Sequence, residues 1–185
     1  MIERVIDKKK MLALIVRGSY RKKKGITFFT PNESTQQFGY MKHKRKYIIK
    51  PHLHKKRLTK IQYTTEVILI LKGILRVDFY NQFKKYLFSK ILKPSDIIML
   101  VSGGHGFKIL QDVEMVEIKQ GPYNLIKDKI KFENVDDGKI KFKKCFFIFT
   151  FLICHSFTFK ISFYSYQESK GNVFSTKPII FTPIK

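Results

Sequence analysis

Cysteine is scarce in this chain, and its rarity excludes two kinds of architecture. The only cysteines among the 185 residues are Cys145 and Cys154, both late in the sequence. Two cysteines cannot build a disulfide framework, and their spacing is not that of a metal-binding cysteine pair. The early apolar run Met11–Val16 is too short for the core of a secretory signal peptide. We therefore expect a protein of the reducing cytoplasm.

Acidic residues are also few. The chain has 14 Asp and Glu against 37 Lys and Arg, which gives a formal net charge of +23. Arg is much rarer than Lys, and the lysines are spread along the whole sequence. Because Arg supplies the bidentate forks that read phosphates and guanine edges, this composition favours a solvated basic surface and indicates no nucleic-acid partner. It remains compatible with a small anionic substrate.

Long apolar runs are missing too. The longest uncharged stretch, Cys145–Phe159, has fifteen residues, whereas a helix needs about 20 to span a bilayer. We therefore expect no transmembrane helix. Residues 136–185 are predicted to form an irregular tail. For its part from residue 143 onward, three interpretations stay open: extra strands, a membrane-associating piece, or poorly structured sequence outside the ancestral domain.

The sequence has no Gly-rich phosphate loop, no nucleophile elbow and no zinc-finger spacing, and residues 46–120 show no helical periodicity. Short β-rich segments separated by turn residues fill that region instead, which is typical of a β-sandwich or barrel. We predict an N-terminal extension with short strands over residues 1–45 and a barrel over residues 46–135. The predicted barrel strands are Tyr47–His54, Gln62–Leu71, Leu75–Tyr80, Lys85–Ile91, Ile97–Val101, Phe107–Leu110 and Glu114–Lys119.

Four residues form a candidate metal site. His52 and His54 alternate in a predicted strand, so both imidazoles point to one face. Glu66 opens a very apolar strand, where a carboxylate needs a compensating charge. His105 follows a Gly-Gly turn able to aim it inward. Three nitrogens and one oxygen suit a divalent metal such as Fe, Mn, Ni or Zn, without discriminating among them.

These segments resemble the paired motifs of the cupin superfamily. His52-Leu-His54 is followed by Glu66 and, six residues after it, by Gly73; Ser95-Asp96 and Gly103-Gly-His105 follow in the second motif. The resemblance implies an all-β fold of the cupin type, a double-stranded β-helix or jelly-roll barrel. It also implies a homodimer formed through the outer sheet face of Val67, Leu69 and Leu71.

The wider pattern is similar to a group of short bacterial cupins that accompany enzymes of surface-sugar and nucleotide-sugar synthesis. The similar stretches include Phe28–Pro31, Gln37–Tyr40, Arg76–Tyr80 and Lys119–Tyr123. The implied substrate is a small carbohydrate-derived molecule. Lys119 is a candidate anchor for an anionic substrate, and Tyr80 and Tyr123 are candidate proton donors.

Three functions remain open from the sequence. The first is a metal-dependent enzyme, an isomerase or epimerase, or an oxygenase if the metal is iron. The second is a metal-free sugar-nucleotide isomerase in which His52 or His54 is the acid/base group. The third is a non-catalytic module that binds or senses a ligand at the barrel mouth.

Overall fold

The computed structural model describes residues 1–22, 24–122 and 128–143. The chain divides into two units, Met1–Cys145 and Phe146–Lys185, and every described residue belongs to the first. That unit is all-β, with a single 3₁₀ turn, η1, at Asp137–Lys139 among the described residues. Its strands are β1 (Ile2–Asp7), β2 (Lys10–Val16), β3 (Gly25–Phe28), β4 (Gly39–Lys42), β5 (Glu66–Tyr80), β6 (Tyr86–Leu92), β7 (Ile97–Leu100) and β8 (Gly104–Lys119).

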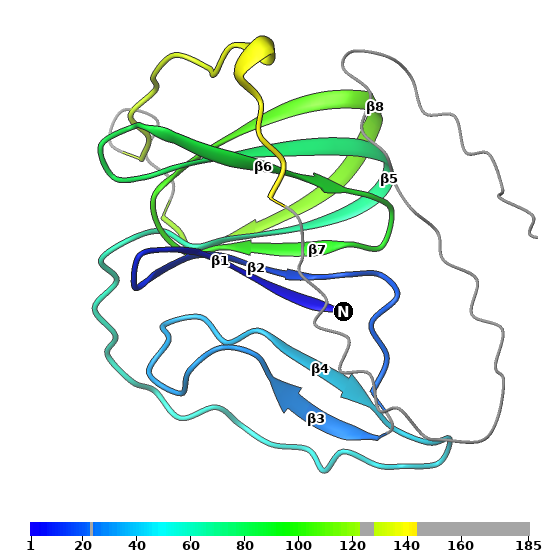
Figure 1. Ribbon diagram of the computed structural model, residues 1–185. Coiled ribbons are helices and arrows are strands. Elements are labelled where there is room, and N and C mark those ends of the chain that lie inside the picture. Colours follow the sequence, from blue (N-terminus) through cyan, green and yellow to red (C-terminus); the bar gives the residue numbers. More distant parts are fainter. Residues whose placement is uncertain (23, 123–127, 144–185) are drawn as a thin grey trace, which may run out of the picture. The chain divides into compact units, whose positions relative to one another are not determined.

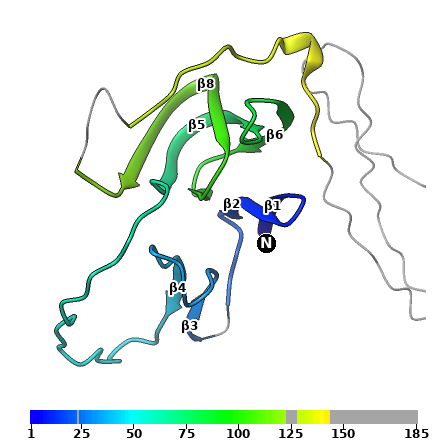
Figure 2. The ribbon, with the colours of Figure 1, turned by 90° about the vertical axis from the view of Figure 1, so that its left-hand side faces the viewer.

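Six of these strands form one antiparallel sheet in the order β1-β2-β7-β5-β6, with β8 also paired to β5. The sheet curls strongly, so that β5, β6 and β8 lie over β7, β2 and β1 (Figure 1). Figure 2 shows the same two layers from the side, with the separate β3–β4 hairpin beneath β1 and β2. The structure thus confirms an all-β, half-barrel-like architecture.

The curl depends on an irregular stretch in the middle of β5. In the first half of β5, Glu66, Ile68 and Ile70 are buried, whereas in the second half Leu75 and Val77 face the same core. The pairing of β5 with β8 shifts register three times between Ile70 and Leu75, and such bulges bend a strand. Gly73 lies there with φ +80°, and a Cβ on it would be 1.9 Å from the carbonyl oxygen of Asp112. Only glycine tolerates this bend.

A continuous apolar core fills the space between the two layers. It is built from alternating residues of the strands, as the period of two in a half-buried strand predicts. A second, smaller cluster on the other side of β2 and β7 joins the sheet to the β3–β4 hairpin. Its buried members are Leu14, Val16, Phe29 and Met99, with Val67 packed against them.

Several strand predictions are confirmed and others are wrong. The predicted strands Gln62–Leu71, from Glu66 onward, and Leu75–Tyr80 are parts of one 15-residue strand, β5; residues 62–65 precede the strand. Phe107–Leu110 and Glu114–Lys119 likewise belong to one 16-residue strand, β8. The predicted strand Tyr47–His54 is irregular, because its residues have neither a pairing partner nor a core to face.

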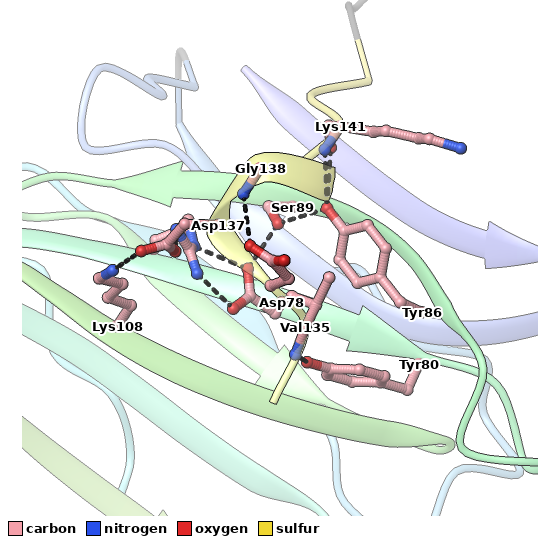
Figure 3. Close-up of polar contacts among 11 residues, drawn as sticks. Asp78, Tyr80, Tyr86, Ser89, Lys108, Val135, Asp137, Gly138 and Lys141 are labelled. Carbon is pink, nitrogen blue, oxygen red and sulfur yellow. Dashed lines mark hydrogen bonds and ion pairs between the residues drawn. The ribbon is translucent and has the colours of Figure 1, made fainter. Parts of the chain in front are cut away.

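The outer face of β5 is covered by the chain after β8. Arg76 and Asp78 are buried and form a two-pronged ion pair, with N–O distances of 2.8 and 3.0 Å. Asp137 of η1 accepts from Arg76 at 2.9 Å, and Ser89 donates to Asp78 at 2.5 Å (Figure 3). This polar face lies under residues 132–142, neither in open solvent nor in a lumen.

Candidate functional site

The most distinctive polar pair on the inner side of the curled sheet joins Glu66 to His105. Glu66 is the first residue of β5 and is only 5% exposed. Its Oε2 lies 3.1 Å from Nε2 of His105, whose side chain is 27% exposed. Nε2–H donates to the carboxylate in this arrangement.

Tertiary curvature brings these two residues together. Along the β5–β8 ladder they lie at opposite ends, since Glu66 pairs with Lys119 and His105 pairs with Phe79. The first half of β5 also pairs with β7, which ends beside Glu66 at Leu100. A turn through Gly103, with φ +73°, then carries the chain to His105. The predicted role of the glycine turn in aiming His105 inward agrees with this geometry.

The Glu66 carboxyl is held in its ionised form. The hydrogen bond from His105 lowers the pKa of Glu66 to about 2, against the opposing effect of burial, and the positive charge of Lys129 adds to the lowering. The Lys129 ammonium lies 3.4 Å from Oε1. At neutral pH Glu66 is therefore a carboxylate that orients an imidazole, and it has no proton to donate.

The inner side of the sheet remains open along β8. Cross-strand partners point to the same face of a sheet, so Phe107 and Ile109 share the inner face with their partners Val77 and Leu75. Both are exposed although their partners are fully buried. By the same register Lys119 shares the face of Glu66. The pair therefore lies beside an accessible surface that is apolar in one part and cationic in another.

The structure does not bring His52 and His54 to this pair. Both lie in the exposed irregular segment before β5, where their rings stand 5.2 Å apart and Nδ1 of His52 contacts the carbonyl oxygen of Lys50 at 2.9 Å. Within the described ranges no three or more His, Cys, Asp or Glu side chains are arranged to hold a metal ion. Of the four predicted metal ligands, the structure brings together Glu66 and His105, which contact each other.

The structure also places Tyr80 on a different face of the sheet from the Glu66–His105 pair. Tyr80 lies on the outer face, buried against Phe132, where its hydroxyl accepts from the backbone N–H of Val135 at 3.0 Å. It therefore has a structural role there. Tyr123 and the tail from residue 144 onward lie outside the described residues. Lys129, which contacts Glu66, belongs to a polar stretch in which no sequence pattern distinguishes it.

Comparison with known proteins gives no further identification. No family model, curated protein or solved structure matches this chain. The function is therefore inferred from the side chains themselves.

A pocket of about 280 Å³ lies on the other side of the sheet. Met99 forms part of its lining, whereas the neighbouring Ile98 and Leu100 face the inner core. The pocket is thus separated from the Glu66–His105 pair by β7. No described residues form a helix with the length and apolar character needed to cross a bilayer.

Proposed function

We propose that this protein is a cupin-type isomerase or epimerase that acts on a small, anionic, carbohydrate-derived molecule without a metal. The observation that carries the proposal is the 3.1 Å contact between the buried, ionised Glu66 and His105 on the open inner side of the sheet. The strongly curled antiparallel sheet and the glycine turn before His105 support a cupin-type fold.

His105 is the proton carrier in this proposal. With Nε2–H bonded to Glu66, the other ring nitrogen, Nδ1, is the basic atom, and it has no protein hydrogen-bond partner among the described residues. Nδ1 removes a proton from a carbon next to a substrate carbonyl; the electron pair of the broken C–H bond forms a C=C bond as the carbonyl π pair moves to the oxygen, which gives an enolate. Return of the proton to the other face of the same carbon completes epimerisation. Return of the proton to the former carbonyl carbon, with transfer of the adjacent hydroxyl proton to the enolate oxygen, completes isomerisation.

Glu66 and the lysines favour this reaction electrostatically. The Glu66 carboxylate stabilises the imidazolium that forms when His105 accepts the proton. Lys129 and Lys119 place positive charge around the same region, which favours an anionic substrate and the negative charge that develops on its oxygen.

The test is turnover of a nucleoside-diphosphate-linked 4-keto-6-deoxyhexose in D₂O, followed by NMR. We expect a new isomer with deuterium from solvent at the reacting carbon, at a rate that a chelator leaves unchanged. His105→Gln should lower the rate about 10²- to 10⁴-fold, whereas the matched control His54→Gln should leave it unchanged. Loss of activity with chelator or in His54→Gln would instead support the four-ligand metal site, and absence of turnover would refute an isomerase acting on this class of substrate.

A further inference from the structure

A second surface, distant in sequence from His105, combines dense positive charge with exposed apolar side chains. Every residue from 44 to 64 is exposed, and no acidic residue occurs between Glu33 and Glu66. Nine basic residues lie in and beside this segment: Lys42, Lys44, Arg45, Lys46, Lys50, Lys55, Lys56, Arg57 and Lys60.

Aliphatic side chains are interspersed among these cations and project into solvent. Leu53 is 96% exposed, Leu58 98% and Ile48 78%. Single exposed apolar residues are common on proteins, but several on one strongly cationic segment form a surface that is both apolar and basic. Figure 2 shows this segment as the long irregular connection between β4 and β5. Near its end, Lys60, Gln62 and Tyr63 line the pocket beside Met11 and Met99.

The β3–β4 hairpin extends the same surface. Ile26 pairs with Met41 across the hairpin, and Phe28 lies two residues along on the same face. All three are exposed, whereas Tyr40, on the opposite face, packs against the second core cluster. Because β4 ends at Lys42, its apolar outer face leads directly into the basic segment. We call Ile26, Phe28, Met41 and residues 42–64 the hairpin–loop surface.

We propose that the hairpin–loop surface binds peripherally to an anionic phospholipid bilayer. Its lysines and arginines contact the negatively charged headgroups, and its exposed aliphatic side chains enter the boundary between headgroups and acyl chains. This proposal concerns a different surface from the proposed catalytic pair and does not depend on it.

The composition of the surface favours lipid over two other partners. A second copy of the chain would bring together two cationic segments that contain no acidic residue, and like charges repel. Nucleic acid is read chiefly by Arg forks and by stacking aromatic rings, yet seven of the nine basic residues are Lys. The surface has three exposed aromatic rings, Phe28, Tyr47 and Tyr63, and Tyr47 already stacks on His43, with ring centroids 4.3 Å apart. Exposed leucine and isoleucine gain most from an apolar medium.

The experiment is co-sedimentation of the full chain with vesicles. Vesicles of phosphatidylcholine alone are compared with vesicles that also contain phosphatidylserine, at low and high salt. We expect binding only to the anionic vesicles, weakened by salt because exposed charges are screened. Lys55→Glu/Lys56→Glu should lower the affinity at least about ten-fold, since each basic residue near an anionic surface contributes about a five-fold factor.

Matched variants distinguish vesicle binding by the hairpin–loop surface from binding caused by the net positive charge of the whole protein. Lys84→Glu/Lys85→Glu makes the same charge change in the exposed β5–β6 turn and should leave binding within two-fold. Leu53→Ser/Leu58→Ser keeps all charges and should weaken binding most clearly at high salt. Equal loss in both charge-reversal variants would refute the proposal. The proposal would also be refuted if Lys55→Glu/Lys56→Glu lost binding to a single-stranded oligonucleotide but bound anionic vesicles as well as the wild type does.

Discussion

Replacing Glu66 by Gln removes the charge of the inner pair while keeping a hydrogen-bond acceptor beside His105. In the folded protein the pKa of Glu66 is lowered from 4.5 to about 2. A difference of that size corresponds to about 3 kcal/mol of stability contributed by the ionised form at neutral pH. Because Lys129 is half-exposed and screened by solvent, and because the amide still accepts a hydrogen bond, we expect Glu66→Gln to cost about 1 to 3 kcal/mol at pH 7.

The dependence on pH has a defined sign. A carboxyl group whose pKa is lowered by folding stabilises the protein above its unfolded pKa, and this contribution is lost as the pH falls through the folded pKa. For Glu66 the window runs from about pH 4.5 down to about pH 2. The difference in stability between wild type and Glu66→Gln should therefore be full at pH 7 and disappear across that window.

Urea unfolding followed by circular dichroism at pH 7, 4 and 3 measures this difference. The control is Glu114→Gln, which removes a carboxylate from an exposed pair with Lys72 at 3.4 Å; such pairs contribute about 0.5 kcal/mol or less. If Glu66→Gln and Glu114→Gln were equally stable at pH 7, or if the cost of Glu66→Gln were the same at every pH, the pair would not be the charged contact described above.

Two further predictions concern the scaffold of the site, and both are measured as changes in the free energy of unfolding. Gly73→Ala should cost about 3 kcal/mol or more, because the new Cβ would lie 1.9 Å from the Asp112 carbonyl oxygen. The control is Gly25→Ala, which should cost about 1 kcal/mol because Gly25 has φ +92° but open space around it. Equal costs for the two variants would contradict the close approach at Gly73. Asp78→Ala should cost about 3 to 5 kcal/mol because it leaves the buried Arg76 guanidinium without its main partner. The double variant Arg76→Met/Asp78→Leu should be more stable than Asp78→Ala, and a double variant less stable than that single one would refute this explanation.

The candidate site was predictable from the sequence only in part. Glu66 at the start of an apolar strand and His105 after a glycine turn are local features, and the structure brings these two side chains together. Placing His52 and His54 in a strand relied on local alternation alone. A strand forms only where another strand pairs with it, and no described strand pairs with that segment. Lys129 contacts Glu66 from 63 residues away in the chain, a separation that no short motif records.

Whether a strand face is apolar or polar follows from the local sequence, whereas whether that face is buried depends on distant parts of the chain. The alternation of Leu75, Val77 and Phe79 with Arg76, Asp78 and Tyr80 predicts one apolar and one polar face, and the structure confirms it. That the polar face is buried follows from residues 132–142, which cross it and supply Asp137 and the backbone of Val135 as partners. Residues 136–143 of the predicted irregular tail are thus part of the scaffold.

By itself, the sequence determined that the described residues form an all-β fold, the approximate bounds of β6 and β7, and which side chains share a face, because these depend on a period of two and on turn residues that are neighbours in the chain. Only the tertiary structure decided that β5 curls far enough for its first residue to meet the beginning of β8, and that His52 and His54 lie apart from that contact. The physical reason is that curvature and strand order come from bulges and pairings between distant segments, whose energies no local pattern contains.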